Sequence, residues 1–503
     1  MPRSWPTNPL LYEINARVWL EELERGRAPG RGPQAPLRLD EVPEEELLRL
    51  KEHGWHGVWL MGVWARSPAG REVARALPEL REEYQRALPD VTEEDIVGSP
   101  YAVAGYTVMP EVGGDEALRR FRERLGGHGL RLMLDFVPNH LARDHSWVEE
   151  CPEAFVQGSE EDLAREPRNY FRGPGRRIFA HGRDPYFPGW SDTVQIDYAS
   201  PLARGRMLGE LMRVAGLCDG VRCDMAMLLL PDVFQNTWGG RLGAEPEDFW
   251  GGAIAAVRAR HPGFLFLAEA YWGREPDLQR AGFDYTYDKE LYDRLRAGDA
   301  AGARAHLGAR ADDQRRCARF LENHDEPRAA SAFGPGRWRA AAAATYCAPG
   351  LKLFHEGQIE GRKVKLPVQL GRRPAEEADP EVERGYLGLL SVLREPLFRS
   401  GAFSLLEVRP AGPEDSSNEA IVALAWSPPE GGAGGHLVAA NLGSRPAYGR
   451  IPFPRAYGEG GWTLRDHWDG SRYEREGGEM VSPGLFVALA PDQVHLFQMA
   501  PSG

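Results

Sequence analysis

Short apolar segments alternate with amphipathic segments of helical period over residues 10–357, and this alternation constrains the fold more than any other feature. Such alternation is typical of repeated βα units built on a parallel sheet. Eight strands interleaved with helices predict an α/β fold, a (β/α)₈ TIM barrel whose functional site lies at the carboxyl ends of the strands. The candidate strands are 10–15, 57–64, 131–137, 220–225, 264–270, 283–288, 319–326 and 351–357.

Three regions depart from this rhythm. Residues 66–97 form a charged insert that we expect to be helical, with either a solvated face or a lip over the site. Residues 141–198 are rich in aromatics, Gly and Pro and are too long for an ordinary βα loop, so we expect an inserted subdomain. From residue 397 onward, short alternating runs between Gly- and Pro-rich turns predict an antiparallel β domain. The predicted domains are a barrel (1–140 and 199–396), an insert (141–198) and a C-terminal β-sandwich (397–503).

Composition excludes several classes of function. The chain has 74 acidic and 61 basic residues, a net charge of −13, which argues against nucleic acid as a partner. Neither a membrane-length apolar stretch nor a signal-peptide pattern occurs, so we expect a cytoplasmic protein without membrane association. The five cysteines show no CxxC spacing, so we expect buried, reduced thiols. The oligomeric state is left open.

Charged and polar side chains gather at the ends of the predicted strands, where a barrel brings them to one face. A carboxylate that follows buried strand residues is costly unless it has a partner or a chemical task. The acids Asp224, Glu269 and Asp325 can converge on one pocket. The polar residues at these ends are Asp135, Asn139, His140, Arg222, Asp224, Glu269, Asn323, His324, Asp325 and Arg328.

Paired carboxylates suit glycoside hydrolysis, in which one attacks the anomeric carbon and the other protonates the leaving oxygen. Arg222 shares a strand face with Asp224 and would keep that carboxylate ionised, as a nucleophile requires. Glu269 follows the apolar run FLFLA, where a raised pKa would suit an acid. The alternative from the residues alone is a barrel metal hydrolase. Its ligands would be Asp135, His140, Glu269 and His324.

Four motifs, DFVPNH, GVRCD, FLAEAYW and FLENHD, resemble in order and position the short motifs of the alpha-amylase superfamily (glycoside hydrolase family 13). The insert then resembles that family's domain B and the C-terminal part its domain C. The resemblance implies a retaining hydrolase that acts on α-linked gluco-oligosaccharides through a covalent glycosyl-enzyme, with no cofactor. Two alternatives are a transglycosylase or trehalose-synthase-like isomerase with the same chemistry, and an inactive member that serves as a binding subunit.

The resemblance also implies roles for individual residues. Asp224 is the expected nucleophile, Glu269 the general acid/base, and Asp325 the acid that holds and distorts the sugar. Asp135 and Asn139 are expected to be framework residues. The expected sugar ligands are Tyr101, His140, Arg222, His324 and Arg328, the last with a loop brace as the alternative.

The chain departs from the family at two places. Asn139 occupies one position of the family's calcium site, but Gln195 and Leu228 replace an expected Asp and His, so we expect no metal. Met227 and Leu228 also replace the Lys-His pair that binds the acceptor glucan in starch-cutting members, and Gly105 replaces an acid. We therefore expect short α-glucosides to be preferred over long glucans. Trp190 is expected either to stack on a sugar or to pack in the core of the insert.

Overall fold

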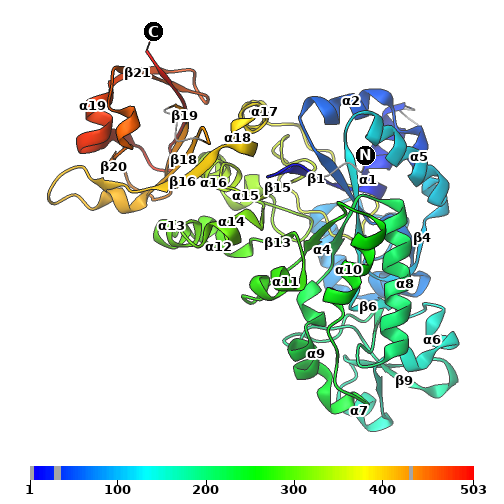
Figure 1. The fold of residues 1–503 in the computed structure, drawn as a ribbon. Coiled ribbons are helices and arrows are strands. Elements are labelled where there is room, and N and C mark those ends of the chain that lie inside the picture. The colour runs from blue at the N-terminus through cyan, green and yellow to red at the C-terminus, as the bar shows by residue number, and fades with distance from the viewer. Residues whose placement is uncertain (1–4, 28–35, 430–433, 503) are drawn as a thin grey trace. The chain divides into compact units, whose positions relative to one another are not determined.

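The computed structural model describes residues 5–27, 36–429 and 434–502. Eight strands form a closed barrel in the order β1-β15-β14-β13-β12-β11-β5-β2, which confirms the predicted fold class (Figure 1). Neighbouring barrel strands such as β2–β5 and β11–β12 are parallel. The barrel strands are β1 (Leu10–Asn15), β2 (Gly57–Met61), β5 (Arg131–Phe136), β11 (Gly220–Cys223), β12 (Leu265–Ala268), β13 (Tyr285–Tyr287), β14 (Cys317–Arg319) and β15 (Leu351–His355).

Two predicted strands differ from the observed ones. The segment 57–64 divides, because Gly62 turns the chain with a φ of +79° between β2 and β3 (Trp64–Arg66). The strand predicted at 319–326 ends at Arg319. Beyond it, Asn323 Oδ1 accepts hydrogen bonds from the backbone N–H groups of Asp325 and Glu326, 2.9 Å each. This local turn replaces the strand ladder, so the last polar motif lies in a loop.

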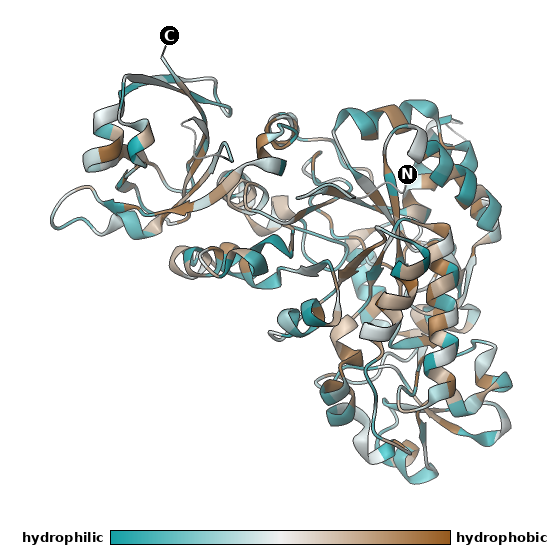
Figure 2. Cartoon of the chain, in the orientation of Figure 1, coloured by the Kyte–Doolittle hydropathy of each residue, from teal (hydrophilic) through white to brown (hydrophobic). Residues whose placement is uncertain are grey.

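Helices alternate with the barrel strands, and in Figure 1 α8 lies beside α10, in agreement with their contacts. Figure 2 shows hydrophobic residues along the strands and hydrophilic residues on helices such as α5. Within the described ranges, no helix is both long and apolar enough to cross a membrane. The helices are α1 (Ala16–Arg27), α2 (Glu44–Glu52), α3 (Pro68–Ala76), α4 (Pro78–Ala87), α5 (Gly114–Gly127), α6 (Trp147–Glu150), α7 (Glu160–Arg165), α8 (Pro201–Leu217), α9 (Pro231–Trp238), α10 (Trp250–Arg260), α11 (Glu275–Ala281), α12 (Lys289–Ala297), α13 (Ala300–Leu307), α14 (Ala311–Arg315), α15 (Ala329–Ala332), α16 (Gly334–Tyr346), α17 (Pro380–Leu393), α18 (Leu397–Ser400) and α19 (Gly477–Glu479).

The chain divides into two compact units. The first contains Tyr12–Tyr287 and Lys365–Ala375, and the second contains Pro6–Leu11, Asp288–Val364 and the chain from Glu376 onward. The barrel strands β2, β5, β11, β12 and β13 therefore belong to the first unit, and β14 and β15 to the second. The predicted domain boundaries stay a prediction.

Two inserts belong to the first unit. The charged stretch 66–97 contains α3 and α4, which pack around a small core that Leu370 completes. The stretch 141–198 forms two small antiparallel sheets, β10-β6 and β7-β9-β8. Their strands are β6 (His140–Ala142), β7 (Gln157–Gly158), β8 (Tyr170–Arg172), β9 (Ile178–Ala180) and β10 (Thr193–Gln195), while β4 (Val103–Val108) pairs with β3.

The C-terminal part of the second unit is an antiparallel β domain, as the sequence predicts. A six-stranded sheet, β16-β18-β19-β24-β21-β22, and a three-stranded sheet, β17-β20-β23, enclose a shared hydrophobic core. The strands are β16 (Ala402–Leu406), β17 (Arg409–Pro410), β18 (Ile421–Ser427), β19 (Gly435–Asn441), β20 (Ala447–Ile451), β21 (Gly461–Asp466), β22 (Arg472–Glu476), β23 (Leu485–Leu489) and β24 (Val494–Pro501).

The cysteines are buried thiols, as predicted, and none of the five forms a disulfide. Burial raises the pKa of Cys218 and of Cys347 to about 12. Thiols held in the neutral form are poor nucleophiles and poor metal ligands. These residues therefore act as small apolar side chains.

Candidate active site

Two neighbouring parallel strands place the first two predicted acids. Cys223 of β11 pairs with Ala268 of β12, and Asp224 and Glu269 follow them directly. The backbone N–H of Glu269 donates to Cys223 O at 3.1 Å, which extends the ladder to the acid itself. Both strands are fully buried. The parallel register therefore puts both carboxylates at the same edge of the sheet.

Arg222 lies between these carboxylates and is completely buried. Its Nη1 donates to Asp224 Oδ1 at 2.8 Å, and its Nη2 lies 2.8 Å from Glu269 Oε2. The Oδ1 atom of Asp135 is 3.5 Å from Nη1. Burial opposes the charge on Arg222, but Glu269 and Asp224 help hold the pKa of its guanidinium well above the ordinary value. One buried cation thus balances a cluster of acids.

Glu269 has polar partners, which differs from the apolar setting expected from FLFLA. Besides Arg222, its Oε2 accepts the backbone N–H of Met225 at 2.6 Å, and its Oε1 accepts the Tyr271 hydroxyl at 2.8 Å. The apolar residues belong to β12, which ends at Ala268, and the carboxylate of Glu269 lies beyond the end of that strand. The raised pKa expected for Glu269 stays a prediction. Arg222, the Met225 N–H and the Tyr271 hydroxyl act against it, because each favours the ionised carboxylate.

Three aromatic rings surround the Arg222 guanidinium. Its Cζ lies 5.3 Å from the ring centre of Tyr101, 5.3 Å from that of Trp59 and 5.7 Å from that of Tyr287. Tyr287 also accepts a hydrogen bond from Arg222 Nε at 3.3 Å. Tyr101 is a predicted site residue, whereas Trp59 and Tyr287 were missed because a strand aromatic looks like core. The sequence feature that could have identified Trp59 and Tyr287 is their position in barrel strands.

His140, the first residue of β6, directly precedes the insert 141–198, is buried, and hydrogen-bonds to the backbone of Tyr101. Burial lowers its pKa to about 4, so the imidazole is neutral near pH 7. The Trp190 ring centre lies 5.0 Å from that of His140. Trp190 therefore packs on a predicted sugar ligand. A neutral imidazole at this place can exchange hydrogen bonds with sugar hydroxyls.

An amide occupies the position where the family's calcium ligands would meet. Gln195 Nε2 donates to both the backbone O and the side-chain Oδ1 of Asn139, at 2.8 and 3.1 Å, and to Ile196 O at 3.0 Å. Leu228 is buried and offers no oxygen. A donor N–H₂ thus contacts the oxygens that would face a cation, and this donor set does not fit calcium.

The third predicted acid belongs to the second unit. Asp325 is half-exposed, and its Oδ2 lies 3.0 Å from Nε2 of the buried His324. Both residues lie in the loop that follows β14. The convergence of these two residues with Asp224 and Glu269 stays a prediction.

Arg328 has the contacts of a loop brace. It is buried, and its Nη1 lies 2.7 Å from Glu322 Oε1, 2.7 Å from Glu356 O and 2.8 Å from His355 Nδ1. Burial raises the pKa of Glu322, although Arg328 acts against this shift. These contacts tie the guanidinium through Nη1 to the loop after β14 and to the end of β15. The contacts thus favour the brace over the sugar ligand.

Two groups of side chains in the second unit have the spacing of metal ligands: Asp288, His306 and Cys317, and Glu395, His436 and His467. In the first group, Asp288 forms a buried ion pair with Arg319, so a cation already neutralises it. In the second group, His436 Nε2 lies 2.8 Å from Glu395 Oε2. A His–carboxylate hydrogen bond accounts for that contact without an ion.

Exposed aromatic side chains occur near the loop that follows Glu269. Trp272 is 42% exposed and Tyr186 of the insert 69% exposed, and their ring centres lie 5.0 Å apart at 80°. Phe187 beside Tyr186 is 67% exposed. By contrast, Met227 and Leu228 are buried, so they present no surface to a substrate. This aromatic pair was not predicted from the sequence, because the insert that contains Tyr186 has no periodic pattern.

Comparisons with known proteins agree with this fold. Residues 45–188 match the model of the alpha amylase catalytic domain. Alpha-amylase MalA of Haloarcula japonica is 27% identical over 71% of this chain and 50% of its own length. An alpha-1,4-glucan:maltose-1-phosphate maltosyltransferase of Pseudomonas aeruginosa is 26% identical over 38% of this chain and 25% of its own. The chain thus spans half or less of the length of these two relatives.

A solved structure extends the likeness to the whole fold. The maltogenic alpha-amylase AmyB of Thermotoga neapolitana superposes with a TM-score of 0.70 at 20% identity, over 99% of both chains. A closed parallel barrel with acids around a buried arginine defines a (β/α)₈-barrel protein with a polar site at its strand ends. The chain is thus similar to the alpha amylase catalytic domain over residues 45–188 and to an alpha-amylase over 71% of its length, and it shares the fold of the Thermotoga neapolitana enzyme.

Proposed function

We propose that this protein cleaves α-linked gluco-oligosaccharides with retention of configuration, through a covalent glycosyl-enzyme. The observation that carries the proposal is the pair of carboxylates on one guanidinium: Asp224 and Glu269 each approach Arg222 to 2.8 Å. Two carboxylates that contact the two Nη atoms of one guanidinium at the ends of adjacent strands support the short separation that double displacement needs.

In this mechanism the ion pair with Arg222 keeps Asp224 ionised, and the carboxylate attacks the anomeric carbon. Glu269 gives its proton to the leaving oxygen and then takes a proton from the acceptor. The Met225 N–H and the Tyr271 hydroxyl fix its orientation through these two steps. Asp325, His324, Tyr101 and the neutral His140 are proposed to bind the sugar.

A second candidate function is transfer of the glycosyl group to a sugar. The exposed pair Trp272 and Tyr186 supports it, because aromatic faces near the acid/base loop can hold an acceptor ring in preference to water. The relatives include maltosyltransferases as well as an amylase. Hydrolysis and transfer share the first step, so both follow from the same carboxylate pair.

NMR of the first-formed product tests the stereochemistry. With maltotriose as substrate, the α anomer should appear before mutarotation produces β. Initial release of the β anomer would rule out double displacement at these carboxylates. The experiment leaves the choice of acceptor aside and depends only on the carboxylate pair.

A further inference from the structure

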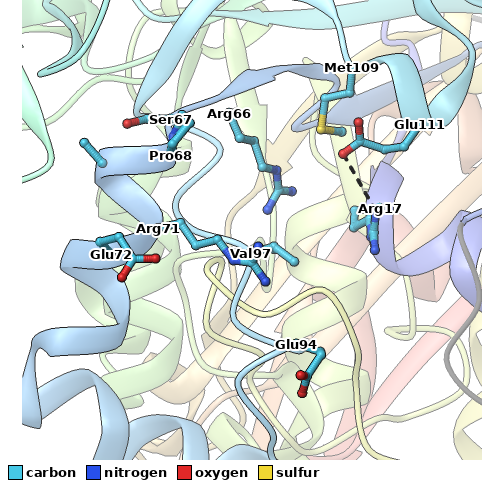
Figure 3. Close-up of a pocket in the computed structure, with 11 residues that line it drawn as sticks. Arg17, Arg66, Ser67, Pro68, Arg71, Glu72, Glu94, Val97, Met109 and Glu111 are labelled. Carbon is cyan, nitrogen blue, oxygen red and sulfur yellow. Dashed lines mark ion pairs between the residues drawn. The ribbon is translucent and has the colours of Figure 1, made fainter.

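A polar cavity of about 560 Å³ lies in the first unit, lined by residues of α1, β3, α3 and the segment 94–97 (Figure 3). Its lining includes neither Asp224 nor Glu269, so it is separate from the carboxylate pair. The volume falls within the range of pockets that hold small molecules. What the cavity offers a ligand follows from its arginines.

Three guanidinium groups enter the cavity from three elements. Figure 3 shows Arg66, Arg71 and Arg17 directed toward a common space. Arg66 Nη1 donates to Gly98 O at 3.0 Å, and Arg71 Nε donates to Ile96 O at 2.7 Å. Arg71 Nη2 also donates to Glu93 O at 3.5 Å. These bonds fix the two side chains in place, and the remaining N–H groups can donate to other acceptors.

Several guanidinium nitrogens lack acceptors. Among the described residues, Nε and Nη2 of Arg66 and Nε of Arg17 are buried without a hydrogen-bond partner. Burial, reinforced by the charge of Arg17, lowers the pKa of Arg66 to about 10. Buried cations without acceptors are costly, and an anion would satisfy both their charge and their hydrogen bonds.

The acidic residues of the cavity do not neutralise this charge. Glu111 is the carboxylate nearest to Arg17, at 3.9 Å from its Nη1. Glu72 is paired with Arg75 at 3.1 Å, and Glu94 is exposed and lies at the lower margin of Figure 3. Three arginines face Glu111, and Glu21, which also pairs with Arg25, acts on Arg17 as well, so positive charge remains in excess. A phosphate group would neutralise this charge, and its oxygens can bind guanidinium groups from several directions.

We propose that this cavity binds the phosphate group of a small ligand, through Arg17, Arg66 and Arg71. The phosphate could come from a sugar phosphate or from inorganic phosphate, and the volume leaves room for a sugar ring beside it. The segment that anchors the arginines continues from Gly98 to Tyr101, whose ring lies over Arg222. A ligand here would therefore contact the same segment that forms one side of the candidate active site.

Isothermal titration at constant ionic strength tests the proposal. The probes are inorganic phosphate, glucose 1-phosphate, glucose 6-phosphate and glucose. We expect the phosphates to bind, glucose to give no heat at the same concentrations, and Arg17→Gln to weaken phosphate binding at least about tenfold, since it removes one charge-assisted hydrogen bond. If a sugar phosphate binds more tightly than inorganic phosphate, the ligand is a sugar phosphate. If the two bind equally, the ligand is the free anion.

The matched control is Arg119→Gln, which removes an arginine that is half-exposed on α5 and pairs only with Glu116 in the same helix. It should bind phosphate like the wild type. Arg17→Lys, which keeps the charge, should lose less affinity than Arg17→Gln, and melting curves of each variant show that it is folded. Absence of phosphate binding, or equal binding by wild type and Arg17→Gln, would overturn the proposal. Because binding and not turnover is measured, that result would leave the proposed glycosidase function intact.

Discussion

At the scale of single residues, Arg222 decides how the candidate site is charged. It is fully buried and reaches both Asp224 and Glu269, so its charge stabilises two carboxylates that would otherwise repel each other. The nucleophile needs this stabilisation throughout the reaction. The acid/base needs to hold a proton only while the leaving group departs, so its other partners matter more.

Replacement of Asp224 by Asn should abolish turnover and preserve the fold. The variant keeps the shape of the side chain but removes the nucleophile, and we expect kcat to fall by at least about 10³-fold, as when other covalent nucleophiles are removed. Steady-state kinetics on maltotriose measures it. The control Asp232→Asn changes an acid that is exposed on α9 and pairs with Arg274, and should retain activity. Retention of a tenth of wild-type activity by Asp224→Asn would refute its assignment.

Glu269→Gln should be severe for natural substrates and milder for those with good leaving groups. An amide cannot protonate the leaving oxygen, a step that is worth about 10²–10⁴-fold. We therefore expect a large loss of kcat/KM on maltose and a much smaller loss on α-glucosyl fluoride, whose leaving group needs no proton. Equal losses on the two substrates would show that Glu269 is not the acid.

The contacts of a site residue were predictable from the sequence where they depend on spacing along one strand. The Arg222–Asp224 pair follows from their two-residue separation, and the structure shows it. The contact of Arg222 with Glu269 depends on the register between β11 and β12, which the sequence does not encode locally. The same holds for Trp59, whose place beside Arg222 depends on barrel closure.

At the scale of elements, the insert 141–198 and the residue that precedes it hold several ionisable groups in their neutral form. Burial lowers the pKa of His140, His145 and His181 to about 4 each. Burial raises the pKa of Asp192 to about 6. Such shifts arise where burial outweighs the nearby opposite charges, which are Glu150 and Asp144 for His145 and Arg143 for Asp192.

Stability should therefore fall between pH 6.5 and pH 4. Below pH 6.5 the unfolded chain protonates these histidines and the folded chain does not, so the free energy of unfolding decreases by up to about 1.4 kcal/mol per pH unit for each. Asp192 acts in the opposite sense and offsets about one of the three. Denaturation in urea at several pH values, with His145→Gln beside the wild type, measures this: the variant should show a shallower dependence. An identical pH dependence would contradict the account.

Chelation should leave the protein unchanged. Gln195 Nε2 donates to the Asn139 oxygens, so no cation is needed there. We expect EDTA to shift Tm by less than about 1 °C. By contrast, removing an ion whose free concentration is 100 times its Kd would lower the free energy of unfolding by about 2.7 kcal/mol. Differential scanning calorimetry with EDTA, or with added calcium, measures the shift. A fall of several degrees in EDTA, reversed by calcium, would show a cation site.

Elements were predictable from the sequence where periodicity is strong. The segment 10–15 forms β1 as expected, because all six of its residues are buried. The segment 319–326 was too long, because the side chain of Asn323 and not the apolar pattern ends the strand. The arginine cavity could not be predicted, because its three arginines come from elements whose packing is set by tertiary structure.

At the scale of the whole molecule, the preferred length of the substrate depends on which side chains are exposed near the site. The positions of the family's acceptor-binding pair are occupied by Met227 and Leu228, and both are buried. The exposed aromatics Trp272, Tyr186 and Phe187 are the candidates among the residues discussed for an acceptor contact in the first unit. A contact of one or two rings suits a short sugar better than a long glucan.

We expect kcat/KM on maltose or maltotriose to exceed that on soluble starch per reactive end, with transfer products at high sugar concentration. Trp272→Ala should lower the ratio of transfer to hydrolysis by about fivefold, since one aromatic contact contributes about 1 kcal/mol. Chromatography of products with and without added acceptor measures both. A rapid fall in starch viscosity, or an unchanged transfer ratio in Trp272→Ala, would contradict this expectation.

The most direct test of the account is to trap the covalent intermediate. In Glu269→Gln, α-glucosyl fluoride can still glycosylate the nucleophile because fluoride leaves unprotonated, but the missing base slows release by water. Intact-protein mass spectrometry should then show one added glucosyl group, and peptide mapping should locate it on Asp224. A glucosyl group on any other residue, or none in a variant that still releases fluoride, would contradict double displacement through Asp224.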